Sequence, residues 1–268
     1  ITLSVPLSGH FEELKRGYHN LVILDFRCAV AQFSTKHKCS IPSLSKDNLK
    51  LKQARNPALM LQTKVIPFDL KLSKIQNVLV ITGPNAGGKT VTLKTIGLVS
   101  WMASCGLPVS VKEAEIPIFD AIFTDIGDAQ SIEQNLSTFS AHLKNLKFIL
   151  KNVTMNSLVL MDELGTGTDP REGASLARAF LEEMAARSSI TIVTTHHGDL
   201  KSFAYEEKCV ENGSMIFDSK TLQPTYQFKQ GLPGSSYAFE ISLTLGVPKN
   251  IIQRARTLFG TTSVKLEN

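Results

Sequence analysis

The sequence has few cysteines, and none of them is paired in a recognisable pattern. Its 268 residues contain four, Cys28, Cys39, Cys105 and Cys209, without any C-x-x-C spacing. This excludes the usual zinc-binding arrangement and gives no sign of a disulfide framework. We therefore expect free thiols in a reducing compartment.

Long apolar runs, internal repeats and low-complexity tracts are also absent. No stretch approaches the roughly 18–20 apolar residues that a membrane-spanning helix requires. With 43% hydrophobic and 20% charged residues, the composition is that of a globular chain. We expect a soluble, intracellular protein without a membrane partner.

The chain begins at Ile1 instead of Met, so we expect a fragment or processed product, and a targeting peptide is neither indicated nor excluded. Cytoplasm, nucleoid and organelle stay open.

The sequence also lacks a dense run of lysine and arginine. Its net charge of +5 and pI of about 9.0 are mildly basic. Such a balance permits a nucleic-acid partner without requiring one, because a solvated basic surface has the same composition.

Short apolar runs alternate with helical patterns through the middle of the chain. Strands buried on both faces are predicted at 77–82, 157–161 and 190–195. Helices are predicted at 89–104, 138–151 and 172–186. This alternation predicts an α/β fold in which helices flank a mostly parallel sheet.

Weaker patterns surround this centre. The amphipathic stretch 10–38 has no partner in the nearby sequence and predicts a short helical stub of a longer helical region. Further predicted elements are strands at 48–54, 64–72 and 116–126, a hairpin at 209–229 and two short helices within 236–259.

A phosphate-binding pattern follows the first apolar run. The segment 83–90 matches G-x-x-x-x-G-K-[ST], and the alternative is a chance glycine-rich turn. Glycines allow the backbone N–H groups to approach an anion closely. Lys89 would reach the β- and γ-phosphates, and the Thr90 hydroxyl would ligate Mg²⁺.

Two adjacent carboxylates, Asp162 and Glu163, follow the second run. Carboxylates at the end of a buried strand are costly to desolvate, which favours a functional role over a solvent-facing acidic pair. Asp162 would hold the metal, and Glu163 would point to the other side and polarise the attacking water.

Two further polar segments are candidates. His196 follows the third run and would sense the γ-phosphate, although a structural strand cap is the alternative. Ser137 begins a helix ahead of Asp162, where ATPases of the ATP-binding-cassette type carry the element that contacts a partner's nucleotide. In that role hydrolysis would depend on dimerisation.

These motifs resemble the ATPase domain of the MutS family, and in particular its MutS-two branch. The resemblance is carried by 83–98, 162–173 and 232–241 and spans nearly the whole chain. It implies a P-loop NTPase of the ATP-binding-cassette type that uses ATP and Mg²⁺ and works as a homodimer. It also implies three parts: 1–40, the end of a helical core or lever; 41–260, the ATPase domain; and 261–268, a tail.

The resemblance assigns roles to individual residues. Glu163, His196 and Lys89 would be catalytic, with His196 as the switch histidine, and Asp162 and Thr90 would bind the metal. Ser137 would contact the partner's ATP. The residues implied in nucleotide binding are Gly83, Pro84, Asn85, Ala86, Gly87, Gly88, Lys89, Thr90, Val91, Ser137 and Tyr226. Tyr226 would stack on the adenine, with ordinary hairpin packing as an equal alternative. Asn56 stands where the family pattern has a histidine.

Several functions stay open. The first is an ATPase that switches a clamp on mismatched or branched double-stranded DNA through neighbouring domains. The second uses the same motor on collided ribosomes, and the third is a non-catalytic regulatory remnant. A transporter ATPase would carry Leu-Ser-Gly-Gly-Gln, which 136–140 does not match. We see no mismatch-recognition domain before residue 1 and no coiled coil or Smr-type nuclease beyond 260, so we expect no nuclease activity in this chain.

Overall fold

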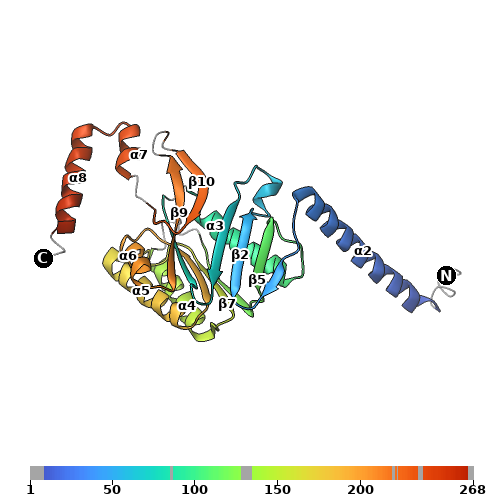
Figure 1. Cartoon of the computed structure of the whole chain (residues 1–268). Coiled ribbons are helices and arrows are strands. Elements are labelled where there is room, and N and C mark those ends of the chain that lie inside the picture. Colours follow the sequence, from blue (N-terminus) through green and yellow to red (C-terminus); the bar gives the residue numbers. More distant parts are fainter. Residues whose placement is uncertain are drawn as a thin grey trace.

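The computed structural model describes residues 9–84, 87–127, 135–218, 221, 223–234 and 238–264. Its centre is a six-stranded sheet in the order β10-β9-β4-β8-β7-β6 (Figure 1). The strands are β4 (Val78–Thr82), β6 (Ala121–Asp125), β7 (Ser157–Met161), β8 (Ile190–Thr194), β9 (Val210–Asp218) and β10 (Gln223–Gln230). All neighbouring strands run parallel except β9 and β10, which form an antiparallel hairpin. The predicted, mostly parallel α/β sheet is confirmed.

Alternation along β4 shows why the central strands are apolar throughout. Val78 and Val80 face one hydrophobic cluster, whereas Leu79 and Ile81 face another on the opposite side of the sheet. A strand with both faces covered needs apolar side chains at every position. Helix α3 (Lys89–Ser104) covers one face, and α4 (Asn135–Asn152), α5 (Pro170–Ala186) and α6 (Asp199–Glu206) cover the other.

A second, smaller sheet packs on the α3 side and was not predicted as a separate layer. Its order is β1-β5-β2-β3, with β1 (Ser43–Ser45), β2 (Asn48–Ala54), β3 (Phe68–Ser73) and β5 (Glu113–Pro117). A short 3₁₀ turn, η1 (Leu59–Leu61), lies between β2 and β3. Phe68 of β3 packs edge-on against Phe228 of β10, with ring centroids 5.7 Å apart, which joins the two sheets.

Three expectations about individual elements are corrected. The strand predicted at 116–126 is two strands, β5 and β6, which belong to different sheets. The strand predicted from residue 64 begins only at Phe68. Helix α6 follows β8 directly and was not predicted; it buries Leu200 and Phe203, too few apolar positions for a clear helical period.

Helices at both ends extend from the body of the molecule (Figure 1). Helix α2 (Phe11–His37) forms as predicted but buries no residue, and it exposes several large apolar side chains. Helices α7 (Ala238–Thr244) and α8 (Lys249–Val264) pack on each other through Phe239 and Phe259. Among the described residues, no helix is both long and apolar enough to cross a bilayer.

Candidate active site

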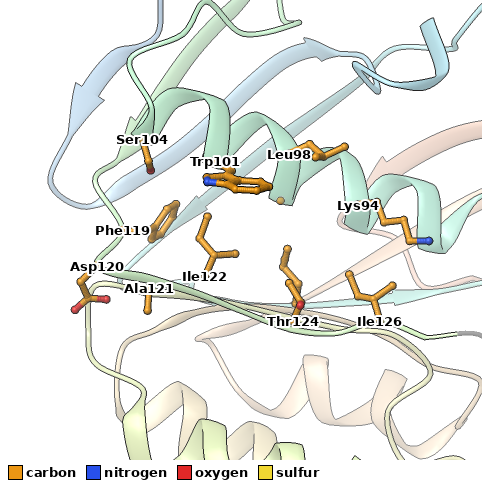
Figure 2. Close-up of a pocket in the computed structure, with 12 residues that line it drawn as sticks. Lys94, Leu98, Trp101, Ser104, Phe119, Asp120, Ala121, Ile122, Thr124 and Ile126 are labelled. Carbon is orange, nitrogen blue, oxygen red and sulfur yellow. The ribbon is translucent and has the colours of Figure 1, made fainter. Parts of the chain in front are cut away.

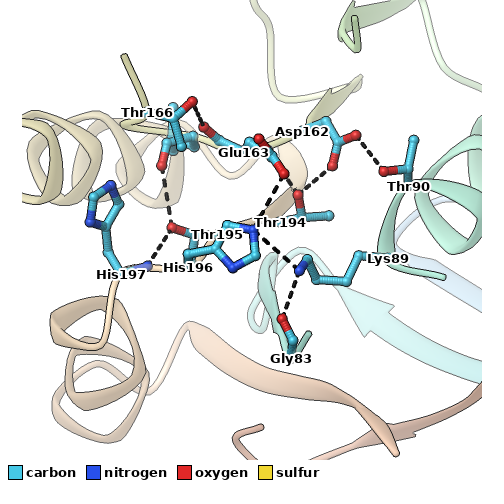
Figure 3. Close-up of polar contacts among 11 residues, drawn as sticks. Gly83, Lys89, Thr90, Asp162, Glu163, Thr166, Thr194, Thr195, His196 and His197 are labelled. Atoms are coloured by element: carbon cyan, nitrogen blue, oxygen red, sulfur yellow. Dashed lines mark hydrogen bonds and ion pairs between the residues drawn. The ribbon is translucent and has the colours of Figure 1, made fainter. Parts of the chain in front are cut away.

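Three strand ends place the predicted site residues together. Strands β4, β8 and β7 are parallel neighbours, so the segments that follow them meet at one edge of the sheet. The loop before Lys89 follows β4, Asp162 and Glu163 follow β7, and His196 follows β8 (Figure 3). Ligands of open parallel sheets bind at this carboxyl edge.

Lys89 occupies the first turn of α3 and is 2% exposed. Its Nζ donates to the carbonyl oxygen of Gly83 at 2.7 Å and lies 3.4 Å from Nε2 of His196. Burial lowers the pKa of Lys89 to about 8, although the charges of Glu163 and Asp162 act in the opposite direction. Because burial disfavours the charged form of Lys89, an anion bound beside its Nζ would stabilise that form.

The backbone before Lys89 requires glycine. Gly83 and Gly88 have φ values of 130° and 97°, which L side chains rarely adopt. A Cβ on Gly87 would lie 3.0 Å from Cβ of Met215. The loop between β4 and α3 is therefore held close to β9, with the N–H groups of the first turn of α3 at its end.

Asp162 is held by two hydroxyl groups. Thr90 Oγ1 donates to one carboxylate oxygen at 2.6 Å, and Thr194 Oγ1 donates to the other. Thr194 is fully buried, and its Oγ1 also accepts the backbone N–H of Glu163 at 2.8 Å. Sequence reasoning assigned Thr194 no role, because a threonine inside an apolar strand resembles ordinary sheet residues.

The Thr90 and Asp162 oxygens are suitable donors for a magnesium ion. Mg²⁺ takes one or two protein oxygens and completes its coordination with water and substrate phosphates. Among the residues that the structure describes, no cluster of three or more histidine, cysteine or acidic side chains could hold a metal. The Thr90 and Asp162 oxygens fit Mg²⁺ that completes its coordination with water and a phosphate ligand.

The Glu163 carboxylate lies beside His196 (Figure 3). Its Oε1 lies 3.3 Å from Nε2 of His196, and its side chain is 40% exposed. The carboxylate is therefore less buried than the sequence indicated, because β7 ends at Met161 and the chain leaves the sheet with a φ of 53° at Glu163. An exposed carboxylate beside an imidazole can accept a proton from water.

His196 lies between two charged groups. Burial lowers its pKa first, the nearby Lys89 cation lowers it further, and Glu163 raises it. Burial and Lys89 thus disfavour the charged ring, and its Nε2 faces both Lys89 and Glu163. Nε2 of the neighbouring His197 lies 3.1 Å from the carbonyl oxygen of Gly165, so this side chain contacts the loop after β7.

A cavity of about 520 Å³ opens beside Lys89 and Thr90. Val91 and Tyr226 also line it, and Tyr226 is 54% exposed. Tyr226 lies at an irregularity of β10, where the φ of 55° turns its side chain out of the regular register. A flat ring in the cavity wall is suited to stacking on a base.

Asn56, noted as a departure from the family pattern, also lines this cavity. Its Nδ2 donates to Thr95 Oγ1 at 3.0 Å, and its Oδ1 accepts the N–H groups of Ala58 and Leu59. The Asn56 amide thereby holds the turn that leads into η1 and connects this turn to Thr95 in the cavity wall.

Not every candidate residue is described. Asn85 and Ala86 lie outside the described residues, and so does the side chain of Ser137. Pro84 accepts the N–H of Gly87 at 3.1 Å. The backbone of residue 137 belongs to the first turn of α4, and Phe139 and His142 of this helix line a small cavity with Glu163 and Gly165.

Comparison with known proteins identifies the family. Residues 79–262 match the family model described as MutS domain V. "Endonuclease MutS2" of Finegoldia magna is 53% identical over 237 residues, which is 88% of this chain and 30% of the relative. "Endonuclease MutS2" of Caldanaerobacter subterraneus subsp. tengcongensis is 49% identical over 99% of this chain and 34% of the relative.

A relative of the same name from Geobacillus sp. is 48% identical over 99% of this chain and 34% of its own length. The chain thus spans about a third of the curated relatives that it matches. The family model covers the strands and loops that form the site, from β4 to α8. The chain belongs to the MutS family.

Proposed function

We propose that the chain is a Mg²⁺-dependent ATP hydrolase, a P-loop module of the ATP-binding-cassette type. The observation that carries this proposal is the convergence of Lys89, Thr90, Asp162, Glu163 and His196 at one sheet edge beside a 520 Å³ cavity. The module would comprise 41–260, with 1–40 and 261–268 outside it.

The residues divide the work by their chemistry. The N–H groups at the start of α3 and the Lys89 cation bind the phosphates, and Thr90 and Asp162 hold the metal. Bound Mg²⁺ would supply charge neutralisation on the phosphate oxygens. Glu163 orients and polarises the attacking water, and His196 holds the Glu163 carboxylate from the other side. Tyr226 supports the adenine from the cavity wall.

Ser137 would complete the site of a second copy. Its backbone lies in the first turn of α4, a helix whose Phe139 and His142 line a cavity with Glu163 and Gly165, and this supports a role for the helix end at a dimer interface. The composite dimer would then couple hydrolysis to a clamp on mismatched or branched DNA. The relatives' name, endonuclease, describes proteins about three times as long, and we propose no nuclease function for this chain.

The test is the steady-state rate of ATP hydrolysis per chain, measured against protein concentration with and without branched DNA. A specific rate that rises with concentration and changes again with DNA supports the dimeric DNA-linked ATPase. A rate of zero despite tight ATP binding contradicts catalysis and supports the regulatory alternative. If the rate responds to ribosomes and not to DNA, the ATPase assignment stands and the proposed partner changes from DNA to the ribosome.

A further inference from the structure

Asp125 forms a polar link between the catalytic edge of the sheet and helix α4. It ends the edge strand β6 and is 7% exposed. One carboxylate oxygen accepts from Nδ1 of His142 at 2.7 Å, and the other accepts from Nδ2 of Asn145 at 2.9 Å. Both partners belong to α4 and lie one turn apart, so a single carboxylate fixes one face of the helix.

The same residue is joined to the predicted metal ligand. The backbone carbonyl oxygen of Asp125 accepts the N–H of Asp162 at 2.9 Å. A chain of hydrogen bonds therefore runs from Thr90 through Asp162 to Asp125, and from there to α4. Buried networks of this kind favour one arrangement over its neighbours, because an unpaired buried carboxylate is costly.

Helix α4 is held by polar contacts near its middle and by buried apolar side chains beyond them. From Phe139 onward, where the structure describes the α4 side chains, full burial of apolar side chains begins at Leu146 and Ile149, which are 7% and 2% exposed. Before them, Leu143 is 36% exposed, and Phe139 packs on the loop at Gly167. Buried apolar side chains thus anchor the second half of the helix, and the contacts of Asp125 lie just ahead of them, together with the contact of Phe139.

We propose that Asp125 is a positioning residue for catalysis across the dimer. Through His142 and Asn145 it would set the position of the first turn of α4, where Ser137 lies, relative to the nucleotide of the second copy. This inference rests on the proposed function, because it assumes that Ser137 acts on the partner's ATP. Beyond the proposed function, we infer that Asp125, His142 and Asn145 of one copy affect hydrolysis of the ATP bound by the other copy.

The test uses Asp125→Asn and His142→Leu in the full chain. Each variant should keep its ATP affinity within about twofold. Its turnover should fall by roughly tenfold to a hundredfold, because each substitution weakens or removes a hydrogen bond to a charged group. His142→Gln, which keeps a donor, should retain more turnover than His142→Leu. Asp120→Asn is the matched control: Asp120 accepts from Thr154 and Ser157 at the other end of the same strands, and its loss should leave turnover unchanged.

Mixed dimers separate the two halves of the site. Lys89→Ala removes phosphate binding but leaves its own α4 intact. If Asp125 acts in trans, mixing Asp125→Asn with Lys89→Ala should restore roughly a quarter of the wild-type rate, since half the dimers mix and each keeps one working site. No recovery, or an ATP affinity that falls in parallel with turnover, would overturn the inference.

The mixture of Ser137→Ala with Lys89→Ala shows whether composite sites exist. If this reference recovers and the Asp125→Asn mixture does not, only the role of Asp125 is wrong. If neither mixture recovers while the wild type hydrolyses ATP, the dimeric composite site itself is wrong, and the inference falls with it.

Discussion

Two cavities lie along helix α3, and they differ in the polar groups that a phosphate-binding site requires. The smaller, about 520 Å³, surrounds the first turn with Lys89 and Thr90. The larger, about 620 Å³, lies farther along the same helix beside strand β6 (Figure 2). Its walls are mostly apolar, including Leu98, Trp101 and Ile122, and its charged residues, Lys94 and Asp120, stand near opposite ends.

The helix itself explains why the smaller cavity is the candidate. The first turn of a helix presents N–H groups without intrahelical partners and the positive end of the helix dipole, whereas the middle presents only side chains. The loop geometry at Gly83 and Gly88 adds backbone donors at that same end. Convergent polar groups, and not volume, distinguish the two cavities.

The largest effect is expected when each of two lysines on α3 is removed in turn. Lys89→Ala should weaken ATP binding by roughly a hundredfold or more, because it removes the buried cation that faces the phosphates. Lys94→Ala, in the wall of the larger cavity, should leave affinity unchanged. Titration with a fluorescent ATP analogue measures both, and equal losses would show that the cavities were assigned wrongly.

Glu163→Gln separates binding from chemistry inside the smaller cavity. The amide keeps the shape but cannot take a proton, so turnover should fall on the order of a hundredfold or more while ATP binding is retained. A stable nucleotide-bound dimer should accumulate, which size-exclusion chromatography with light scattering detects. Normal hydrolysis by this variant would refute the assignment of Glu163.

The lowered pKa of Lys89 predicts a pH dependence for nucleotide affinity. The cation of the free chain is lost as pH rises through about 8, and bound phosphates would restore it, so affinity should fall above that pH. The expected loss is up to roughly tenfold per pH unit, with proton uptake visible by calorimetry in buffers of different ionisation enthalpy. Lys89→Arg, which stays charged, should bind with little pH dependence; if wild-type affinity is equally flat, the proposed contact is wrong.

The smallest effect is expected in the larger cavity. Trp101 is the only tryptophan of the sequence and is 63% exposed, so tryptophan fluorescence reports on this cavity. Trp101→Phe should change ATP affinity by less than about twofold, because the ring belongs to an apolar wall that offers no phosphate donors. A larger loss would mean that the two cavities bind one ligand together.

Local patterns were sufficient for much of the fold and part of the site. The runs at β4, β7 and β8 are apolar at every position because both faces are covered, and that pattern is visible without the structure. The phosphate loop is also local, since its glycines, Lys89 and Thr90 are consecutive. The division of 113–125 between two sheets was missed because strand pairing depends on distant partners.

The sequence by itself determined the α/β class, the loop before α3 and the candidate groups that follow each buried strand, because periodicity and short motifs are properties of neighbouring residues. Only the tertiary structure decided how those groups meet. The strand order places Thr194 under Asp162 and His196 between Lys89 and Glu163. It also places Asp125 against His142, because contacts between residues far apart in the chain arise only when the sheet and its helices pack.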